Sequence, residues 1–428
     1  EIRTPLNGIL GMARLLSECD LPEDQREFVE TISYSGEALL AMINDILDLS
    51  KMEAGMMQVE FIPFELDRLV FSVLELLASR AQEKGLEIVA IIAPDVPKRL
   101  VGDPGRLRQV LLNLVGNAVK FTTEGGITVS VSLDPSAPKS AEVRFVVSDT
   151  GIGIPDEVQP RLFDKFTQAD SSISRRFSGT GLGLAISKRI VDLMGGQIGL
   201  KSTMGKGSNF WFKIPFAVRS KSKTHRHSLA GRSWVASCSN PVLEEAVKTA
   251  IENLGCSVRQ TADPFDALRL LASVAPDRVD HAIIDFSTVG SRLQQLVSLA
   301  EELEIDKSRV FWVTSLVKRK EAEDLARVGF TRAIPRPFHE GALLRKLSGV
   351  NGRNGKRLIG LKEGRKPVTQ RATPRRVLLV EDNMSSLKVA RAILSRDGHH
   401  VSVAMSAKEA LEELDRARAQ YRAGLVMA

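Results

Sequence analysis

Cysteine is scarce in this 428-residue chain, and the three present, Cys19, Cys238 and Cys256, show no pairing pattern. Such usage is typical of a reducing compartment and gives no sign of a cysteine-bound metal cluster. No uninterrupted apolar run approaches the roughly 18 residues that a membrane-crossing helix needs, and no stretch has the composition of a signal peptide. We therefore expect these residues to be cytoplasmic. If a longer parent protein is anchored in the cell membrane, we expect the anchor to lie N-terminal to them.

A Walker-type lysine motif (GxxxxGKS or GxxxxGKT) is also missing, which excludes a P-loop nucleotide site. The net charge of +7 invites a nucleic-acid partner, but the charge is concentrated in two stretches. Residues 217–232 carry five cations and no acid, and residues 351–376 carry nine cations and one acid. Both are rich in Gly, Ser, Pro and Thr, which is typical of linkers, and the remainder is mildly acidic. We expect no nucleic-acid partner.

Polar residues recur on one face of an amphipathic helix expected over residues 106–122. Asn113 and Asn117 are one turn apart, so both amides project from the same face, and Lys120 extends that stripe. Leucine, valine and alanine cover the other side of the helix. Because magnesium prefers oxygen ligands, two amides and a lysine on one face can hold Mg²⁺ and phosphates.

Two glycine-bearing loops follow. Asp149 ends a strand-like run and opens the loop DTGIGIP, in which Gly151 and Gly153 allow close approach of the backbone to a flat ligand. A lone carboxylate there suits an exocyclic amine such as that of adenine. The second loop, GTGLGL, opens an amphipathic helix whose N–H groups can meet phosphate; its members are Gly179, Thr180, Gly181, Leu182, Gly183 and Leu184.

The order of these three motifs resembles the N, G1 and G2 boxes of the ATPase family that joins histidine kinases, type II topoisomerases, mismatch-repair ATPases and ATP-driven chaperones. The run FDKFTQAD at residues 163–170 resembles the F box of histidine kinases. The resemblance implies that ATP and Mg²⁺ are bound. It implies that Asn113 and Asn117 hold magnesium, that Lys120 contacts phosphate and that Asp149 recognises adenine. Residues 179–184 would wrap around the phosphates.

A helical hairpin is expected at the start of the chain. Apolar residues alternate in steps of four and three along both helices, which is typical of a coiled-coil seam. Two facing seams favour a dimeric four-helix bundle over a hairpin packed on its own domain. The seam residues are Ile2, Leu6, Ile9, Ala13 and Leu16, then Phe28, Ile32, Ser35, Leu39, Met42, Ile46 and Leu49.

The segment EIRTPLNGILGMARLL resembles the phosphoacceptor box of histidine kinases, His-Glu-x-x-Thr-Pro. Glu1 matches the glutamate after the histidine, and Thr4 matches the threonine, so the acceptor itself is expected just upstream of Glu1. The resemblance implies that Glu1 accepts the imidazole proton and that Thr4 orients a water in the reverse, phosphatase, reaction. Thr4 can also be read as an ordinary helix residue before a proline.

After the first linker the chain repeats itself at a shift of 143 residues, with strands and helices alternating in both copies. The second copy resembles a response-regulator receiver, in which Glu381 and Asp382 would bind magnesium. Its acceptor aspartate is expected at Ala428 or one position beyond. In the first copy Cys238 and Ser239 replace the acidic pair, although Asp285 stands at the acceptor position. We therefore expect a degenerate receiver.

The expected fold class is multidomain: an all-α hairpin, a two-layer α/β ATP-binding sandwich, and doubly wound α/β receiver-like domains. Together the motifs resemble a hybrid sensor histidine kinase, which implies a homodimer and a response regulator or histidine phosphotransfer protein as partner. A clamp-type ATPase of the same nucleotide fold and a non-catalytic receiver scaffold are the alternatives. The expected parts are 1–56 (hairpin), 62–217 (ATP-binding domain), 218–232 (linker), 233–349 (degenerate receiver), 350–374 (linker) and 375–428 (partial receiver).

Overall fold

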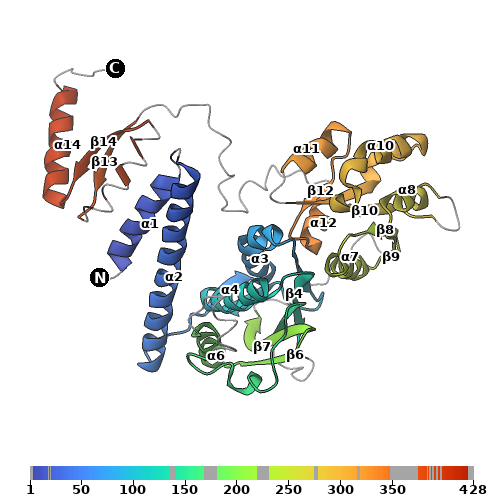
Figure 1. Cartoon of the computed structure of the whole chain (residues 1–428), viewed down its shortest axis with the longest axis horizontal. Helices are drawn as coiled ribbons and strands as arrows, with labels where there is room; N and C mark the ends of the chain where they lie inside the picture. The colour runs from blue at the N-terminus through green and yellow to red at the C-terminus, as the bar shows by residue number, and fades with distance from the viewer. Residues whose placement is uncertain are drawn as a thin grey trace. The chain divides into compact units, whose positions relative to one another are not determined.

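The computed structural model describes residues 3–17, 19, 21–134, 141–167, 181–218, 231–273, 278–315, 319–347, 375–382, 384, 387, 390–391, 394–395 and 398–422. The chain forms two compact units (Figure 1). One unit is Lys51–Arg353, and the other combines Glu1–Ser50 with Asn354–Ala428.

The larger unit begins with a mixed seven-stranded sheet covered by helices (Figure 1). Helices α3 (Leu66–Glu83), α4 (Pro104–Phe121) and α6 (Gly183–Leu193) form the second layer, in which α4 packs against both others. The expected two-layer α/β sandwich is therefore confirmed. The strand order is β1 (Ile62–Glu65), β3 (Arg99–Gly102), β7 (Gly207–Val218), β5 (Ala141–Asp149), β4 (Gly126–Leu133) and β2 (Glu87–Ile92), with β6 (Gln197–Thr203) on β7.

Alternation of side chains explains how this sheet meets its helices. On β4, Ile127, Val129 and Val131 are buried, while the residues between them are half-exposed polar residues. On β5, Val143 and Phe145 follow the same rule. Period-two burial of this kind places one face of the sheet against the helix layer. The sequence pattern missed β1 and β3, because four residues are too few for a visible alternation.

The same unit continues into a parallel five-stranded sheet. The strand order is β12 (Ala333–Pro335), β11 (Val310–Thr314), β10 (His281–Asp285), β8 (Ser233–Ser237) and β9 (Ser257–Gln260). Two separate apolar clusters lie on the two faces of the sheet. The expected doubly wound α/β arrangement is confirmed. Its helices are α7 (Pro241–Asn253), α8 (Pro264–Ala272), α9 (Phe286–Val289), α10 (Leu293–Glu302), α11 (Arg319–Arg327) and α12 (Glu340–Leu347).

The smaller unit contains the helical hairpin and the C-terminal half domain. Helix α1 (Arg3–Ser17) packs on α2 (Glu23–Glu53) through Leu10, which lies where a Cβ on Gly36 would clash. Buried Leu6, Ala13 and Val29 complete that contact. The half domain has two parallel strands, β13 (Arg376–Val380) and β14 (His400–Ala404), followed by α14 (Ala407–Arg422).

The hairpin uses its expected seam differently on the two helices. On α1, Leu6 and Ala13 of the expected seam are buried inside the hairpin, whereas Ile9 and Leu16 of the same seam are about half exposed. The seam of α2 points away from α1, because Val29 and Gly36 occupy the inner face instead. An apolar stripe is thereby left on the outside of α2; its exposed members are Phe28, Ile32, Leu39, Met42 and Ile46.

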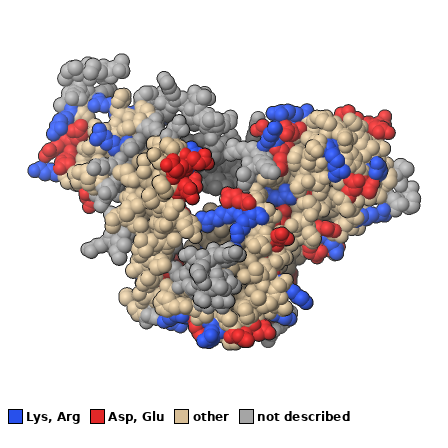
Figure 2. Space-filling view, in the orientation of Figure 1, with Lys and Arg blue, Asp and Glu red and all other residues tan. Residues whose placement is uncertain are grey.

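Charged side chains of both signs are intermixed over the described residues on the face drawn in Figure 2. Within the described part of the chain, no helix is both long enough and apolar enough to cross a membrane.

Candidate functional site: three motifs around helix α4

Helix α4 carries the polar stripe that the sequence predicts. The carboxylate of Asp103 caps it by accepting a hydrogen bond from the Arg106 amide at 2.9 Å, and Pro104 follows at the first position. Leu107, Val110, Leu111, Leu114, Val115, Ala118 and Val119 are buried against the sheet and neighbouring helices. Asn113 and Asn117 are half-buried on the opposite side.

A second helix fixes the amide of Asn113. Its Nδ2 donates to Oγ of Ser187 on α6 at 2.8 Å, and its Oδ1 faces Nδ2 of Asn117 at 3.5 Å. Gly183, which opens α6, lies so close that a Cβ there would sit 2.4 Å from Asn113 Oδ1. The start of the third motif therefore lies directly against the first. Ser187 was not among the predicted site residues, because a serine in an apolar helix gives no signal by itself.

Asp149 stands at the end of β5, as expected. Its Oδ1 accepts hydrogen bonds from the amides of Gly151 (2.9 Å) and Ser208 (3.2 Å). Burial raises the pKa of Asp149, although both amide bonds work in the opposite direction. Both hydrogen bonds recorded for this carboxylate within the described residues go to Oδ1.

The two glycines after Asp149 also have a structural reason. A Cβ on Gly151 would lie 2.6 Å from the carbonyl oxygen of Phe121, at the end of α4. Gly153 has φ +72°, and a Cβ there would lie 2.1 Å from the carbonyl oxygen of Thr203. Close packing of backbone on backbone therefore requires glycine at both positions. This packing holds the second motif against the C-terminal end of α4.

The remaining residues of the third motif are only partly described. Gly181, with φ +68°, accepts a hydrogen bond through its carbonyl from the amide of Phe166 at 3.1 Å. Leu182 is buried, and Leu184 lies in the first turn of α6. Gly179 and Thr180 lie outside the described residues.

Lys120 sits in the last turn of α4, with its Nζ 5.0 Å from the centre of the Phe121 ring. Partial burial lowers the pKa of this lysine, because the charged ammonium loses part of its water shell. A phosphate group bound beside Lys120 would offset this desolvation cost. All three predicted motifs thus converge around α4, which gives amide oxygens, a cation and a carboxylate within one region.

The other predicted sites lie in the smaller unit. Glu1 lies outside the described residues, and Thr4 is in α1 with no described side chain. Glu381 and Asp382 directly follow β13, at the carboxyl end of a parallel strand, where a receiver acidic pair is expected. No group of three or more His, Cys, Asp or Glu residues in the described ranges is arranged to hold a metal ion.

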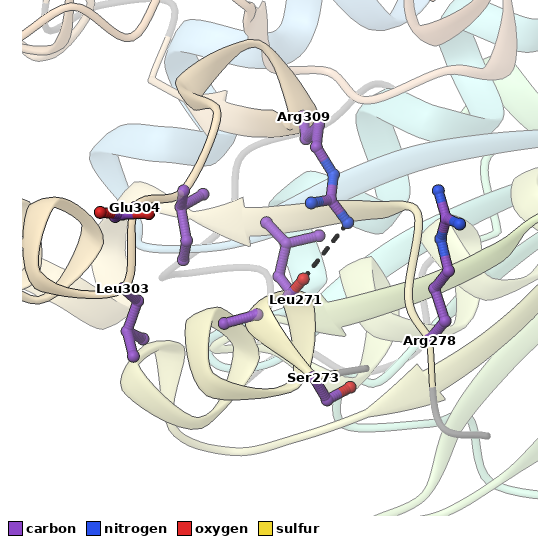
Figure 3. Close-up of a pocket in the computed structure, with 8 residues that line it drawn as sticks. Leu271, Ser273, Arg278, Leu303, Glu304 and Arg309 are labelled. Atoms are coloured by element: carbon purple, nitrogen blue, oxygen red, sulfur yellow. Dashed lines mark hydrogen bonds between the residues drawn. The ribbon is translucent and has the colours of Figure 1, made fainter. Parts of the chain in front are cut away.

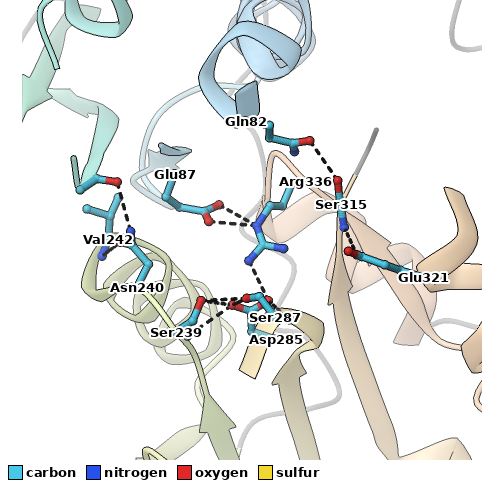
Figure 4. A network of polar contacts seen from close by, with 11 residues as sticks. Gln82, Glu87, Ser239, Asn240, Val242, Asp285, Ser287, Ser315, Glu321 and Arg336 are labelled. Carbon is cyan, nitrogen blue, oxygen red and sulfur yellow. Dashed lines mark hydrogen bonds and ion pairs between the residues drawn. The ribbon is translucent and has the colours of Figure 1, made fainter. Parts of the chain in front are cut away.

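The carboxylate of Asp285, at the end of β10 in the five-stranded domain, is enclosed by hydrogen bonds. Asp285 is fully buried and accepts bonds from Ser239, Ser287 and Arg336, the last at 2.7 Å from Nη2 to Oδ1 (Figure 4). Burial alone would raise the pKa of Asp285, but the Arg336 guanidinium and the two serines hold it below its ordinary value. Cys238 is a neutral thiol, because burial and the neighbouring carboxylates raise its pKa.

A cavity of about 480 Å³ lies elsewhere in the receiver-like domain, between the ends of α8 and α10 (Figure 3). Its Arg309 donates to the carbonyls of Leu271 and Val279 and, through Nε, to that of Asp280. The guanidinium is thus committed to main-chain oxygens. Since none of the three nucleotide motifs lines this cavity, the convergent residues around α4 define the candidate site.

Comparison with known proteins supports this assignment. Residues 1–55 match the "His Kinase A (phospho-acceptor) domain", and residues 102–218 match the "Histidine kinase-, DNA gyrase B-, and HSP90-like ATPase" family. Sensor protein GacS of Pseudomonas syringae pv. syringae is 36% identical over 94% of this chain and 44% of its own length. Signal transduction histidine-protein kinase BarA of Escherichia coli K12 is 35% identical over 96% of this chain and 44% of its own length.

Among solved structures, full-length ShkA in complex with AMPPNP superposes with a TM-score of 0.65 and 32% identity, covering 96% of this chain and 81% of that one. The chain spans less than half the length of these two curated relatives.

Proposed function

The chain belongs to the hybrid sensor histidine kinases, and from that membership we propose that it moves the ATP γ-phosphoryl group to a histidine and then to a receiver aspartate. The observation that carries the proposal is the meeting of three nucleotide motifs around α4. Gly183 lies against Asn113, and Gly151 lies against Phe121 at the end of the same helix.

The cleft binds ATP, as the family of its ATPase domain does. Oδ2 of Asp149 accepts the adenine amine, while Oδ1 is held by two main-chain amides. Asn113 and Asn117 offer amide oxygens, which fit a hard cation such as Mg²⁺. Bound there, Mg²⁺ would neutralise phosphate charge. Lys120 adds a positive charge to the same face of α4. Such a transfer depends mostly on positioning and charge neutralisation.

The hairpin supplies the phosphoacceptor and the dimer. A histidine directly before Glu1 would attack the γ-phosphorus through one ring nitrogen while the bond to the β,γ-bridging oxygen breaks and ADP leaves, and Glu1 would take the proton from the other nitrogen. Thr4 orients a water for the reverse hydrolysis. The exposed apolar stripe on α2 pairs with a second copy, which forms a four-helix bundle. A response regulator or a histidine phosphotransfer protein then takes the phosphoryl group. Glu381 and Asp382 form the ion site of the second receiver.

Substitution of Asn117 by Asp tests the nucleotide assignment. The new carboxylate lies beside phosphate, and we expect Mg-ATP affinity to fall by about tenfold or more, which corresponds to about 1.4 kcal/mol. Because Asn117 is half-buried at the cleft rather than in the core, the melting temperature should stay unchanged. Calorimetric titration of the chain with Mg-ATP measures the affinity, and Asn44→Asp at an exposed position of α2 is the matched control. Equal affinities for Asn117→Asp and the parent chain would contradict the proposal.

The phosphoacceptor assignment is tested separately. None of the six histidines of the chain lies in a His-Glu-x-x-Thr-Pro setting. We therefore expect the chain to bind Mg-ATP without labelling itself from γ-labelled ATP. A chain extended upstream by the rest of the first helix, with a histidine before Glu1, should acquire acid-labile label. Label on the unextended chain would place the acceptor elsewhere.

A further inference from the structure

Strand β2 is apolar on both of its faces, unlike the strand beside it. The helix layer covers the face to which Ile88 contributes. On the other face β4 presents Thr128 and Ser130, but their direct neighbours on β2 are Val89 and Ile91. An apolar pair on the polar face of an edge strand needs a cover of its own, since edge strands exposed in this way are prone to unwanted pairing.

The receiver-like domain provides this cover. Val89 is fully buried, and it belongs to the apolar cluster that otherwise consists of receiver residues, with Ile91 packed against it. Helix α7 lies along β2 and presents the small side chains of Ala246 and Ala250, one turn apart, next to Ile91. Small residues on the helix allow its backbone to approach the strand closely. The core of one domain is thereby continued by a strand of the other.

Polar contacts surround this apolar centre. Asn240 Nδ2 donates to the carbonyl of Gly125 at 3.1 Å, and Ser315 Oγ donates to Gln82 Oε1 at 3.0 Å (Figure 4). The ring of His339 stacks on that of Phe71 of α3, with ring centres 3.9 Å apart. The arrangement of an apolar centre inside a polar rim is typical of specific interfaces.

One arginine joins the receiver pocket to the ATP-binding domain. Nε of Arg336 donates to both carboxylate oxygens of Glu87, at 2.9 and 3.2 Å, while Nη2 of the same guanidinium donates to Asp285 (Figure 4). Glu87 opens β2 and is 7% exposed, and Asp285 is fully buried. A single cation thus faces two buried carboxylates from two domains. Removal of one partner from such an arrangement leaves an uncompensated buried charge and is strongly destabilising.

We propose that the receiver-like domain of residues 233–349 is an intramolecular docking module that holds the β2 edge of its own ATP-binding domain. Its emptied acidic pocket serves this contact: Arg336 occupies the pocket as a fixed internal cation, and Glu87 is the carboxylate that it binds across the interface. While the domains are docked, Asp285 is closed to phosphoryl groups and to metal ions. The surface formed by α7 and Arg336 is likewise closed to other partners.

The three native cysteines report on this docking in the intact chain. Cys238 packs against the cluster that contains Val89, Cys256 is buried within the receiver core, and Cys19 is exposed in the other unit. Alkylation by iodoacetamide, followed by mass spectrometry of each cysteine peptide, separates the three rates. The alkylation rate of Cys238 reports opening of the interface, and that of Cys256 reports unfolding of the receiver-like domain. The rate of Cys19 reports the reactivity of the reagent itself.

Two substitutions on opposite sides of the interface test the proposal. Arg336→Gln removes the shared cation, and Val89→Asp places a charge in the apolar centre. Either change would by itself raise the pKa of the Cys238 thiol and slow its alkylation, since the thiolate is the reactive form. We expect the Cys238 rate instead to rise by about tenfold or more, because the interface opens. Arg327→Gln, on the exposed side of α11, is the control and should change nothing.

The outcomes are distinct. Faster alkylation of Cys238 in the two variants, while Cys256 is still alkylated slowly, supports docking. If Arg336→Gln also accelerates the alkylation of Cys256, the receiver-like domain has unfolded. The Cys238 rate in Val89→Asp, a substitution in the other domain, then tests docking. An unchanged Cys238 rate in Val89→Asp, with Cys19 reacting as in the parent chain, overturns the proposal.

Discussion

At the scale of single residues, local hydrogen bonds orient the carboxylate of Asp149, for which we propose a role in adenine recognition. Two main-chain amides fix Oδ1, and partial burial raises the pKa of the group. The ionised form is the one that accepts a hydrogen bond from adenine. As pH falls through this raised pKa, ATP affinity should decline, by about tenfold per pH unit below it. The decline should begin at a higher pH than the ordinary aspartate value of about 3.9 would give.

Asp149→Asn supplies the comparison for that pH dependence, because its amide oxygen accepts a hydrogen bond but does not titrate. Protonation of ATP itself is common to both proteins and cancels in the ratio of their affinities. Titrations between pH 4 and 7 should therefore show a ratio that changes with pH. A constant ratio would remove Asp149 from nucleotide recognition.

Ser187 is predicted to influence nucleotide binding indirectly, through the amide of Asn113. It is not itself a predicted ligand of the nucleotide or the ion, but its Oγ accepts a hydrogen bond from Nδ2 of Asn113 at 2.8 Å and so orients that amide. A neutral hydrogen bond contributes about 0.5–1.5 kcal/mol. Ser187→Ala should therefore weaken Mg-ATP binding by about two- to tenfold. The loss should shrink when ATP is titrated without magnesium, because the amide is predicted to serve the ion.

Exposed Ser298 on α10 is the matched control for that substitution, since its hydroxyl bonds only to the carbonyl of Gln294 in its own helix at 3.1 Å. Ser298→Ala should leave both titrations unchanged. Equal losses with and without magnesium in Ser187→Ala would show that the serine supports packing rather than the position of the Asn113 amide.

At the scale of elements, the cap of α4 holds two segments together. Oδ1 of Asp103 accepts from the Arg106 amide, and Oδ2 accepts from the Glu60 amide at 3.1 Å. Loss of a helix cap costs about 1 kcal/mol, and the second bond adds to that figure. Asp103→Ala should lower the melting temperature of the chain by about 2–4 °C, whereas Asp103→Asn, which keeps an acceptor oxygen, should lower it less.

Thermal unfolding followed by circular dichroism measures both variants. A similar fall in melting temperature for alanine and asparagine would assign the effect to the lost charge rather than to the cap.

The sequence predicted helices and strands well wherever the spacing of apolar residues and the sequence motifs agreed. The helix expected over residues 106–122 and the long second helix of the hairpin appeared where helical and heptad spacing placed them. The short strands β1 and β3 were missed. The sequence also placed Asn113, Asn117 and Asp149 in one site, because glycine loops and helical spacing are local signals.

The contributions of Ser187 and Glu87 could not be read in that way. Ser187 acts from position 187 on a side chain at position 113, and Glu87 meets Arg336 across 249 residues. A pairing between such distant positions leaves no trace in local spacing. The one available signal was the run EIVAII, whose apolar residues on both faces indicate a strand covered on both sides.

At the scale of the whole molecule, the larger unit combines the proposed nucleotide site with a receiver-like domain in which Asp285 is fully buried. Burial and the nearby Arg345 charge lower the pKa of His339, at the docked interface, to about 3. A histidine with a depressed pKa stabilises the folded state above the ordinary value of about 6.5 and loses that contribution as pH falls toward the depressed one. Acidification should therefore weaken the same contact between the ATP-binding and receiver-like domains that Arg336 joins.

The smaller unit carries the surface that we propose joins two copies of the chain. The stripe on the outer face of α2 includes Ile32, 47% exposed, and Leu39, 46% exposed, at heptad spacing. Ile32→Glu with Leu39→Glu places two charges in the proposed seam, and we expect dimer association to weaken by about a hundredfold or more. Leu47→Glu is the control, since Leu47 is 50% exposed but lies off the stripe. Sedimentation velocity measures the change: the double variant should sediment as a monomer at a concentration where the parent chain and Leu47→Glu are dimers. Dimers of unchanged stability in the double variant would place the contact between copies on another surface.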